Sequence, residues 1–333
     1  MQICVIGQTG DIFFELKETN PWSAFFERII NDGNSIATRS EIPNYDALIC
    51  LGYHPSVLTD ELIVRVPISK RILINWEPES VEPELYSQRY YNQFGHRISP
   101  SRFWAEKIHG SFFTWPQEKL LVAPKFEDWK IRDRKIAIIQ ANKFSAHKDS
   151  MYALRRRVIW KLGSKGFLKL YGKNWDSSPI LNLRQWVSNA RRQKARNISL
   201  NIGTISRPPS GVYAGEVLDK NSTYKKFQMA LVIENSLDYL SEKLFDAVSG
   251  GCVVVYVGAP LGPDFNDMPQ ILLPKPTLLN IEQAIYKVMD LTDEQRYRLF
   301  ISQYKILGRN ERNRWNFNVL ESLAKDCLRK LYS

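Results

Sequence analysis

The stretch YKKFQMALVIENSLDYLSEKLFDAVSGGCVVVYVG, residues 224–258, decides the fold of this 333-residue chain. Its apolar runs predict a buried strand at Met229–Glu234 and another at Cys252–Val257, and the segment Glu242–Ser249 between them has the periodicity of a helix. A strand, a helix and a second strand in this order form the repeating unit of a parallel sheet. We therefore expect an α/β fold with parallel strands around this segment.

The same alternation continues on both sides of this segment. Upstream, the pattern predicts a strand at Lys135–Gln140, a helix at Met151–Leu162 and a strand at Phe167–Tyr171. Residues 174–223 are polar and basic, which is typical of an excursion or a lid rather than of a core. Downstream, the periodicity predicts three helices, at Asn280–Asp290, Asp293–Leu307 and Asn313–Leu331.

The first third of the chain has its own strands and helices. Apolar runs predict strands at Gln2–Gly7, Ala47–Leu51 and Arg71–Trp76, with an amphipathic helix at Pro21–Ile30. A polar stretch, Phe126–Arg134, separates this part from the rest. We expect the GT-B architecture, in which two Rossmann-like parallel-sheet domains face a cleft. The predicted boundaries are an N-terminal domain at 1–125, a linker at 126–134, a C-terminal domain at 135–310 and a C-terminal helix at 311–333.

Composition limits the classes of function. Hydrophobic residues make up 44% of the chain and aromatic residues 12%, which is enough to bury sizeable cores. No apolar run approaches the roughly 20 residues that span a bilayer, and the N-terminus lacks the pattern of a signal peptide. The sequence therefore predicts a soluble, unexported, cytoplasmic protein.

The net charge of +11 is compatible with binding to nucleic acid, to an anionic membrane surface or to an anionic small substrate. No zinc-finger, RRM or KH pattern accompanies the basic clusters, which argues against nucleic acid. The basic segment Leu183–Ile198 could rest on an anionic membrane, with the protein peripheral on the inner membrane face. A solvent-exposed helix is the simpler interpretation of that segment.

Metal-binding patterns are absent from the sequence. The four cysteines and four histidines are scattered without ligand spacing, so we expect neither a disulfide nor a zinc site. No Asp-x-Asp occurs to hold a metal–diphosphate pair. Chemistry on phosphates would then depend on Lys, Arg and helix ends, with no metal required and a divalent ion at most stimulatory.

The polar turn that follows the strand Met229–Glu234 could bind an anion. Ser241 can cap the next helix, and a diphosphate there would meet free backbone N–H groups, the positive end of the helix dipole and the charge of Lys243. Glu242 can accept hydrogen bonds from sugar or ribose hydroxyls. The alternative is that Glu242 and Lys243 are ordinary first-turn residues and that Glu234 is a buried cap.

This segment resembles the signature of the α1,3/4-fucosyltransferase family (glycosyltransferase family 10), whose core reads roughly Tyr-Lys-Phe, Phe-Glu-Asn-Ser and Tyr-Val-Thr-Glu-Lys. The chain departs from it at Ser241, which replaces a threonine, and in a shorter connection between Asn235 and Tyr239. The resemblance implies that the C-terminal domain binds the donor nucleotide sugar and the N-terminal domain the acceptor. The donor site would be built from the matching residues, which are Tyr224, Glu234, Asn235, Tyr239, Glu242 and Lys243.

A second similarity lies upstream. The family has an arginine at the start of a helix that leads to a strand ending in Tyr-Gly, and Arg155 precedes Tyr171-Gly172 in the same way. Because the family's arginine contacts the donor diphosphate, the resemblance implies this role for Arg155. Arg156 and Arg157 would point elsewhere, since neighbouring residues do not share a helix face. The alternative is a solvated basic helix face.

A third similarity lies in the N-terminal domain. ILINWEPES, residues 72–80, resembles the family's Trp-Met-Asn-x-Glu-Ser-Pro segment, whose glutamate is thought to act as the catalytic base. Alignment on Asn75 makes Glu77 its counterpart. Glu79 is the rival, because carboxylates two residues apart lie on the same side of an extended segment. A surface acidic turn is the remaining alternative.

Together these similarities imply inverting transfer of fucose from GDP-fucose to a hydroxyl of a galactose/N-acetylglucosamine-type glycan. Glu77 would take the acceptor proton, while Arg155 and Lys243 would stabilise the leaving diphosphate. Rival functions are a GT-B transferase that uses another nucleotide sugar, a basic nucleic-acid-binding protein without enzymatic activity, and a silent lectin-like relative. Candidate sugar platforms, although such residues more often belong to a core, are Trp76, Tyr86, His96 and Trp115.

Overall fold

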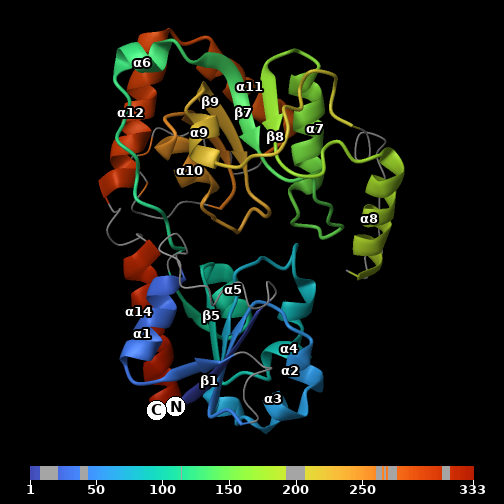
Figure 1. The fold of residues 1–333 in the computed structure, drawn as a ribbon. Coiled ribbons are helices and arrows are strands. Elements are labelled where there is room, and N and C mark those ends of the chain that lie inside the picture. Colours follow the sequence, from blue (N-terminus) through green and yellow to red (C-terminus); the bar gives the residue numbers. More distant parts are fainter. Residues whose placement is uncertain are drawn as a thin grey trace. The chain divides into compact units, whose positions relative to one another are not determined.

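The chain forms two compact units, each built on one parallel sheet (Figure 1). The computed structural model describes residues 1–7, 22–37, 44–113, 115–192, 207–259, 265, 268, 276–309 and 316–333. The N-terminal unit comprises Met1–Lys119 together with Arg312–Ser333, and the C-terminal unit comprises Leu120–Glu311.

The residues expected to form a linker, 126–134, are part of the C-terminal unit. They form helix α6 (Phe126–Lys130) and the start of strand β7 (Asp133–Ile139). Trp129 of α6 is fully buried and stacks on Phe300 of helix α12 (Asp293–Arg309), with ring centroids 6.4 Å apart. Burial of such a large aromatic side chain stabilises the position of α6, although its flanking residues are polar.

The N-terminal sheet has six parallel strands in the order β2-β1-β3-β4-β5-β6. The predicted strands are confirmed as β1 (Gln2–Gly7), β3 (Ala47–Leu51) and β4 (Arg71–Ile74). The sequence did not reveal the other strands, which are short and partly polar. They are β2 (Ser35–Ala37), β5 (His96–Ser99) and β6 (Ser111–Phe112).

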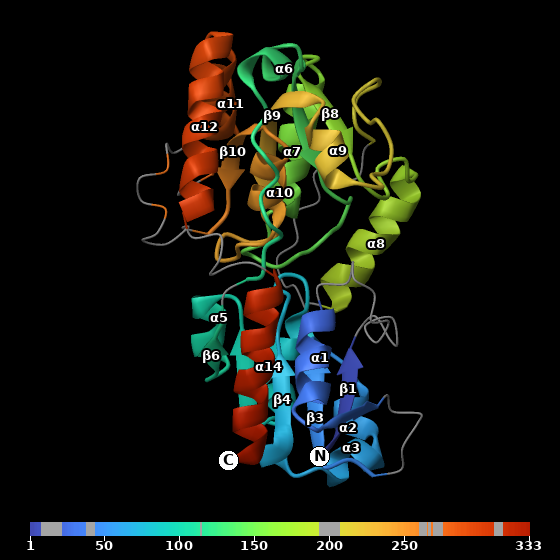
Figure 2. The same ribbon diagram turned by 60° about the vertical axis from the view of Figure 1, so that its left-hand side comes forward.

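Side chains from the two faces of this sheet pack into two separate cores. Ile3 and Val5 of β1 pack with helices α1 (Ser23–Asn31) and α14 (Asn316–Tyr332), which lie side by side (Figure 2). Alternate residues of a strand point to opposite faces, so the intervening Cys4 and Ile6 pack on the other side. That side is covered by α2 (Ser56–Thr59), α3 (Glu61–Arg65), the 3-10 turn η3 (Pro83–Tyr86), α4 (Gln88–Tyr91) and α5 (Arg102–Lys107).

The C-terminal sheet has four parallel strands in the order β10-β9-β7-β8. All of its strands were predicted from the sequence, because β9 and β10 are buried runs and β7 and β8 each contain buried apolar residues. The strands besides β7 are β8 (Leu168–Tyr171), β9 (Phe227–Ile233) and β10 (Val253–Val257). The helices besides α6 and α12 are α7 (Tyr152–Gly163), α8 (Pro179–Arg192), α9 (Lys220–Tyr224), α10 (Lys243–Ser249) and α11 (Leu278–Met289).

The order of the C-terminal strands fixes where a ligand would bind. From β7 the chain moves to β8 on one side, and it later returns to β9 on the other side. Right-handed connections then put α7 and α10 on opposite faces of the sheet. Accordingly, α7 packs with α11, whereas α10 packs with α9 and α12. In such sheets ligands bind at the carboxyl ends of the strands where the direction reverses, which here lies between β7 and β9.

Residues 174–223 are more ordered than the sequence suggested. They contain α8 and α9, and the side chains of Trp175, Asn182 and Val212 are at most 3% exposed. The expectation of a long polar excursion is therefore wrong for the described part of this segment. Residues 193–206, and with them the end of the candidate membrane segment Leu183–Ile198, lie outside the described residues.

The remaining features concern membranes and thiols. None of the helices in the described ranges is both long enough and apolar enough to cross a bilayer. All four cysteines are buried free thiols, at Cys4, Cys50, Cys252 and Cys327.

Candidate functional site at the carboxyl ends of the C-terminal strands

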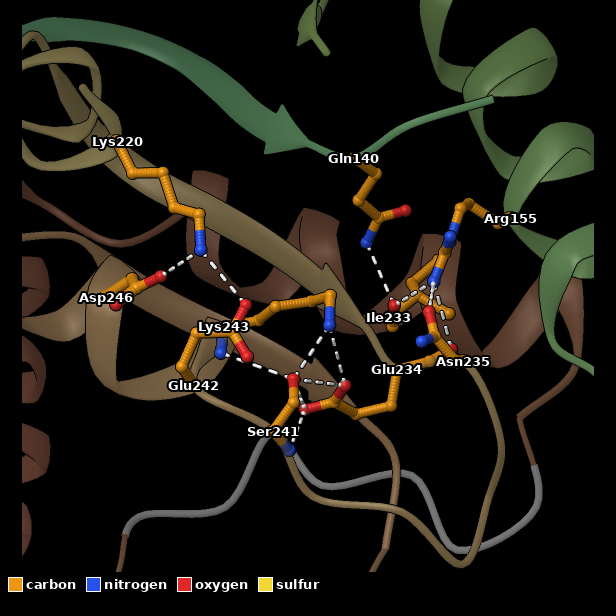
Figure 3. Close-up of polar contacts among 10 residues, drawn as sticks. All are labelled: Gln140, Arg155, Lys220, Ile233, Glu234, Asn235, Ser241, Glu242, Lys243 and Asp246. Carbon is orange, nitrogen blue, oxygen red and sulfur yellow. Dashed lines mark hydrogen bonds and ion pairs between the residues drawn. The ribbon is translucent and has the colours of Figure 1, made fainter. Parts of the chain in front are cut away.

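Side chains join the carboxyl ends of β7 and β9, at the point where the strand order reverses. Gln140 follows β7 and donates a hydrogen bond from Nε2 to the carbonyl oxygen of Ile233, at 3.0 Å. Arg155 of α7 donates from Nη2 to the same carbonyl at 2.7 Å and to that of Glu234 at 3.1 Å (Figure 3). Because buried backbone carbonyls must be paired, these bonds hold the end of β9 in one conformation.

Arg155 is a buried residue. Its side chain is 3% exposed, and Nη2 also lies 3.3 Å from Oδ1 of Asn235. Desolvation lowers the pKa of Arg155 to about 10, although the nearby Tyr152 and Glu234 oppose this shift. The guanidinium lies 4.9 Å from the ring centre of Tyr152. The alternative that Arg155 belongs to a solvated basic helix face is therefore wrong.

A buried carboxylate organises the turn after β9. Glu234 is 0% exposed and accepts hydrogen bonds from the backbone N–H of Ser241 at 2.9 Å and from its hydroxyl at 2.7 and 3.0 Å. The ammonium of Lys243 lies 3.4 Å from the same carboxylate and donates to the Ser241 hydroxyl at 2.8 Å. A buried charge needs such partners, so Glu234 fixes the position of Lys243, whose side chain is 19% exposed.

The hydroxyl of Ser241 and the glycine that follows β10 also contribute to the structure of this turn. Ser241 lies one residue before Glu242, the N-cap residue of α10, and its hydroxyl accepts a long hydrogen bond from the first helical N–H, that of Lys243, at 3.4 Å. The same hydroxyl donates to the carboxylate of Glu234. Gly258, just after β10, packs directly on Glu234. A Cβ at this position would lie 2.6 Å from the Glu234 Cγ, so a larger residue would displace the carboxylate.

Glu242, at the start of α10, belongs to a second ionic group (Figure 3). Lys220 lies 3.0 Å from Oε1 of Glu242 and 2.8 Å from Oδ2 of Asp246. Burial opposes ionisation of Glu242, but Lys243 and Lys220 outweigh it and lower the pKa of this carboxyl to about 2. Glu242 is 35% exposed, so an ionised carboxylate reaches the surface beside Lys243.

The other predicted donor residues contribute mainly through packing. Asn235 is 9% exposed, and its carbonyl accepts a hydrogen bond from the Met151 N–H at 3.0 Å. Tyr239 is 4% exposed. Tyr224 lies before the opposite, amino end of β9, and burial raises its pKa well above the ordinary value. The structure therefore brings Arg155, Glu234, Asn235, Glu242 and Lys243 to one end of the sheet and leaves the main chain of Tyr224 at the other.

In the N-terminal unit, the turn after β4 is held by Asn75 and Tyr86. Asn75 is 1% exposed, accepts from the Glu77 N–H at 3.1 Å and donates to the Tyr86 hydroxyl. That hydroxyl donates to the carbonyl of Glu77 at 2.8 Å. The rival carboxylate, Glu79, forms an ion pair with Lys107. The two glutamates therefore differ in their surroundings, which the sequence could not show.

Comparisons with known proteins support this architecture. No protein-family model and no curated protein matches the chain. Among solved structures, it is similar to Anabaena HepE in complex with UDP and glucose, with a TM-score of 0.57, 10% identity and coverage of 98% of this chain and 99% of that one. The chain has the GT-B fold.

Two further structures share the GT-B fold. An α1,3-fucosyltransferase matches with a TM-score of 0.55 and 14% identity, over 100% of this chain and 90% of that one. An α-glucosyltransferase in complex with UDP and a 13-mer DNA matches with a TM-score of 0.55 and 10% identity, over 98% of this chain and 100% of that one. Identities this low show the fold and leave the family open.

Of the residues considered as sugar platforms, Tyr86 is buried, whereas Trp76, His96 and Trp115 are partly buried. Trp76 forms edge contacts with Trp22 and Trp115, with ring centroids 4.6 and 5.0 Å apart. Tyr86 is 6% exposed and packs on Trp104. The pKa of His96 is lowered, mainly by burial. These contacts favour the core interpretation.

Sequence analysis missed Gln140, Lys220 and Gly258. Gln140 carried a signal, because it ends its strand in the same way that Glu234 ends β9. Lys220 and Gly258 carried none, since their roles depend on contacts with residues distant in sequence. Within the described ranges, no group of three or more His, Cys, Asp or Glu side chains could hold a metal ion.

Proposed function

We propose that this chain is a nucleotide-sugar-dependent glycosyltransferase that moves fucose from GDP-fucose to a glycan hydroxyl with inversion. One observation carries the proposal: Glu234, Asn235, Glu242 and Lys243 of the fucosyltransferase-like block lie at the strand-order reversal of a GT-B C-terminal sheet. There Glu234 contacts both Arg155 and Lys243. The fold supports glycosyl transfer in general, and the sequence block supports GDP-fucose as the donor.

Donor binding in this proposal depends on cations held by the protein. Lys243 would contact the diphosphate, and Glu234 with Ser241 would hold its ammonium in place beforehand. Arg155 would add positive charge behind the end of β9. Such preorganised charges stabilise a leaving group more effectively than solvent does.

The sugar or ribose would be recognised by polar groups beside these cations. Glu242 is ionised and partly exposed, so its carboxylate can accept hydrogen bonds from hydroxyls. Asn235 and Tyr239 would shape the donor pocket from the turn after β9. Tyr224 would support this pocket from the core, since it is 2% exposed.

The transfer itself requires a base. We propose Glu77: its carboxylate takes the proton of the acceptor hydroxyl, the acceptor oxygen bonds to the anomeric carbon, and the bond from that carbon to the phosphate oxygen breaks with departure of GDP. The alignment on Asn75 supports this choice, and hydrogen bonds with Asn75 and Tyr86 fix the main chain of Glu77. The reaction needs no metal in this proposal, and a divalent ion would at most stimulate it.

Donor and acceptor panels test the proposal. The chain is incubated with GDP-fucose, UDP-glucose, UDP-galactose and dTDP-glucose in the presence of N-acetyllactosamine, and products are identified by mass spectrometry. We expect a fucosylated product with GDP-fucose alone. Transfer from a UDP sugar instead would establish a GT-B transferase with another donor.

The same panels separate the rival that binds nucleic acid. DNA is included as an acceptor because one structural neighbour was solved with UDP and DNA. DNA binding that falls steeply with salt, without transfer from any donor, would favour a basic nucleic-acid-binding protein. A cytoplasmic location and a contact of the segment Leu183–Ile198 with the inner membrane face stay predictions, and sedimentation with anionic vesicles tests the latter.

A further inference from the structure

Arg156, next to Arg155 on α7, is a buried charge with unused donors. Its side chain is 3% exposed. Nη2 donates to Oδ1 of Asn142, whereas Nε and Nη1 have no hydrogen-bond partner. Desolvation lowers the pKa of Arg156 to about 9, and no acidic group opposes this shift. A buried guanidinium in this state is costly, because a desolvated cation needs an anion or several acceptors.

Other buried arginines differ from Arg156 in how many of their donors are paired. Arg155 and Arg296 each have an unpartnered Nε, whereas two nitrogens of Arg156 have no partner. Arg71 is equally buried, and its Nε, Nη1 and Nη2 atoms all donate to backbone carbonyls, those of Val66, Gln93 and Val64. Arg97 uses the same three atoms on the carbonyls of Tyr91, Ile108 and Phe94. Against these examples, Arg156 has the donors of a binding site rather than of a structural arginine.

The surroundings of Arg156 place it at the ligand-binding end of the sheet. Asn142 follows β7 by a few residues, and its amide donates to the carbonyl of Asn174 at 2.8 Å, which turns Oδ1 toward Arg156. The guanidinium lies 4.0 Å from the ring centre of Phe144 and 5.5 Å from that of Trp175. Trp175 in turn donates to the carbonyl of Gln140, the residue that contacts the end of β9.

We infer that Arg156 anchors an unassigned oxyanion subsite at the carboxyl end of β7, which takes a phosphate group. We expect an anion at this place because the guanidinium of Arg156 has unpaired donors. The choice of phosphate among oxyanions rests on the proposed function. Planar guanidinium groups suit phosphate well. Because Phe144 covers the guanidinium of Arg156, this ring must move aside for a ligand to enter.

The phosphate could come from the donor diphosphate or from a separate phosphorylated ligand. Calorimetry with inorganic pyrophosphate, GDP and guanosine distinguishes these sources in wild type, Arg156→Met and the matched control Arg157→Met, whose arginine is exposed. We expect Arg156→Met to weaken pyrophosphate binding about 10-fold or more, as for loss of a charge-assisted bond, and Arg157→Met to have little effect. Unchanged pyrophosphate affinity in Arg156→Met would overturn the inference.

The outcomes also separate this inference from the proposed function. If GDP binding falls with pyrophosphate binding while guanosine binding does not, the donor supplies the phosphate. If only pyrophosphate binding falls, the subsite serves another ligand. Binding of pyrophosphate through Arg156 without any binding of nucleotides would refute the proposed function and support the subsite.

A second measurement covers the case in which Arg156→Met does not fold. Wild-type crystals are soaked with tungstate, a heavy analogue of phosphate, and anomalous density is measured. We expect a tungsten peak within hydrogen-bonding reach of Nε or Nη1 of Arg156. Ordered water at both atoms, with tungstate elsewhere, would show that water satisfies this arginine and would refute the subsite.

Discussion

The carboxyl ends of the strands differ between the two sheets. In the C-terminal unit, that end carries buried charged groups in mutual contact, with Arg155 on two carbonyls of the β9 end and Lys243 on Glu234. In the N-terminal unit, the turn after β4 is held by neutral hydrogen bonds between Asn75, Tyr86 and the backbone of Glu77.

This difference suggests that the C-terminal unit stabilises the leaving group and that the N-terminal unit supplies the base. Buried, paired charges are fixed in position and can stabilise a charged leaving group without rearrangement. In the N-terminal unit, the main chain that carries the proposed base is fixed by hydrogen bonds of Asn75 and Tyr86. We therefore expect changes in the C-terminal unit to affect donor binding, turnover and stability, and a change at Glu77 to affect transfer alone.

Glu77→Gln should have the largest effect on turnover. Loss of a general base lowers rates by roughly 10²–10⁴-fold, while donor binding should stay within a few-fold of wild type. The control, Glu79→Gln, should lose far less, because Glu79 is paired with Lys107. Steady-state kinetics with GDP-fucose and a neutral glycan test both variants. If Glu79→Gln were the inactive one, the alignment of this segment would be wrong by two residues.

Lys243→Met should lower turnover by on the order of 100-fold or more, because it removes charge that is needed as the phosphate departs. Since Glu234 would lose its cationic partner, some loss of stability should accompany it. Lys225→Met, which changes an exposed lysine before the opposite, amino end of β9, is the control and should leave the rate unchanged. Wild-type turnover in Lys243→Met would return this lysine to a structural role.

Arg155→Ala should destabilise the C-terminal unit as well as reduce activity. It removes the Arg155 donor from the carbonyl of Glu234 and one of the two side-chain donors from that of Ile233, which keeps Gln140. A buried acceptor left unpaired costs about 1–3 kcal/mol. Chemical denaturation monitored by tryptophan fluorescence measures this loss. Unchanged stability together with unchanged turnover would mean that the contacts at the end of β9 are dispensable.

Lys220→Met should have the smallest effect, a rise of a few-fold in the KM for the donor with little change in kcat. Lys220 helps to keep the pKa of Glu242 near about 2, so Glu242 stays ionised and its contribution is lost only as pH falls toward that value. Without Lys220 this pKa rises, and donor binding should begin to fall at a higher pH on the acid side. Lys220→Arg should keep the wild-type dependence of donor binding on pH. If donor binding fell at the same acidic pH in wild type, Lys220→Met and Lys220→Arg, the proposed role of Lys220 would be contradicted.

The sequence predicted much of the C-terminal unit because its information is local. Strands such as β9 and β10 are continuous apolar runs, and the block from Glu234 to Lys243 is contiguous. The prediction was weaker where contacts join distant residues. The pairing of Lys220 with Glu242, the carbonyl contacts of Arg155 and the place of α14 beside α1 depend on the folded chain. Short strands such as β2 and β6 gave too little periodicity to detect.

The most direct test of the central claim is a thermal-shift measurement with GDP, UDP, dTDP and CMP on the wild-type chain. A ligand that binds only the folded state raises the melting temperature, and the increase grows with the logarithm of ligand concentration divided by Kd. The account predicts that GDP gives the largest increase, and that Lys243→Met reduces it. Equal shifts with all four nucleotides would remove the reason for naming fucose, and no shift with any of them would contradict a nucleotide site at the end of β9.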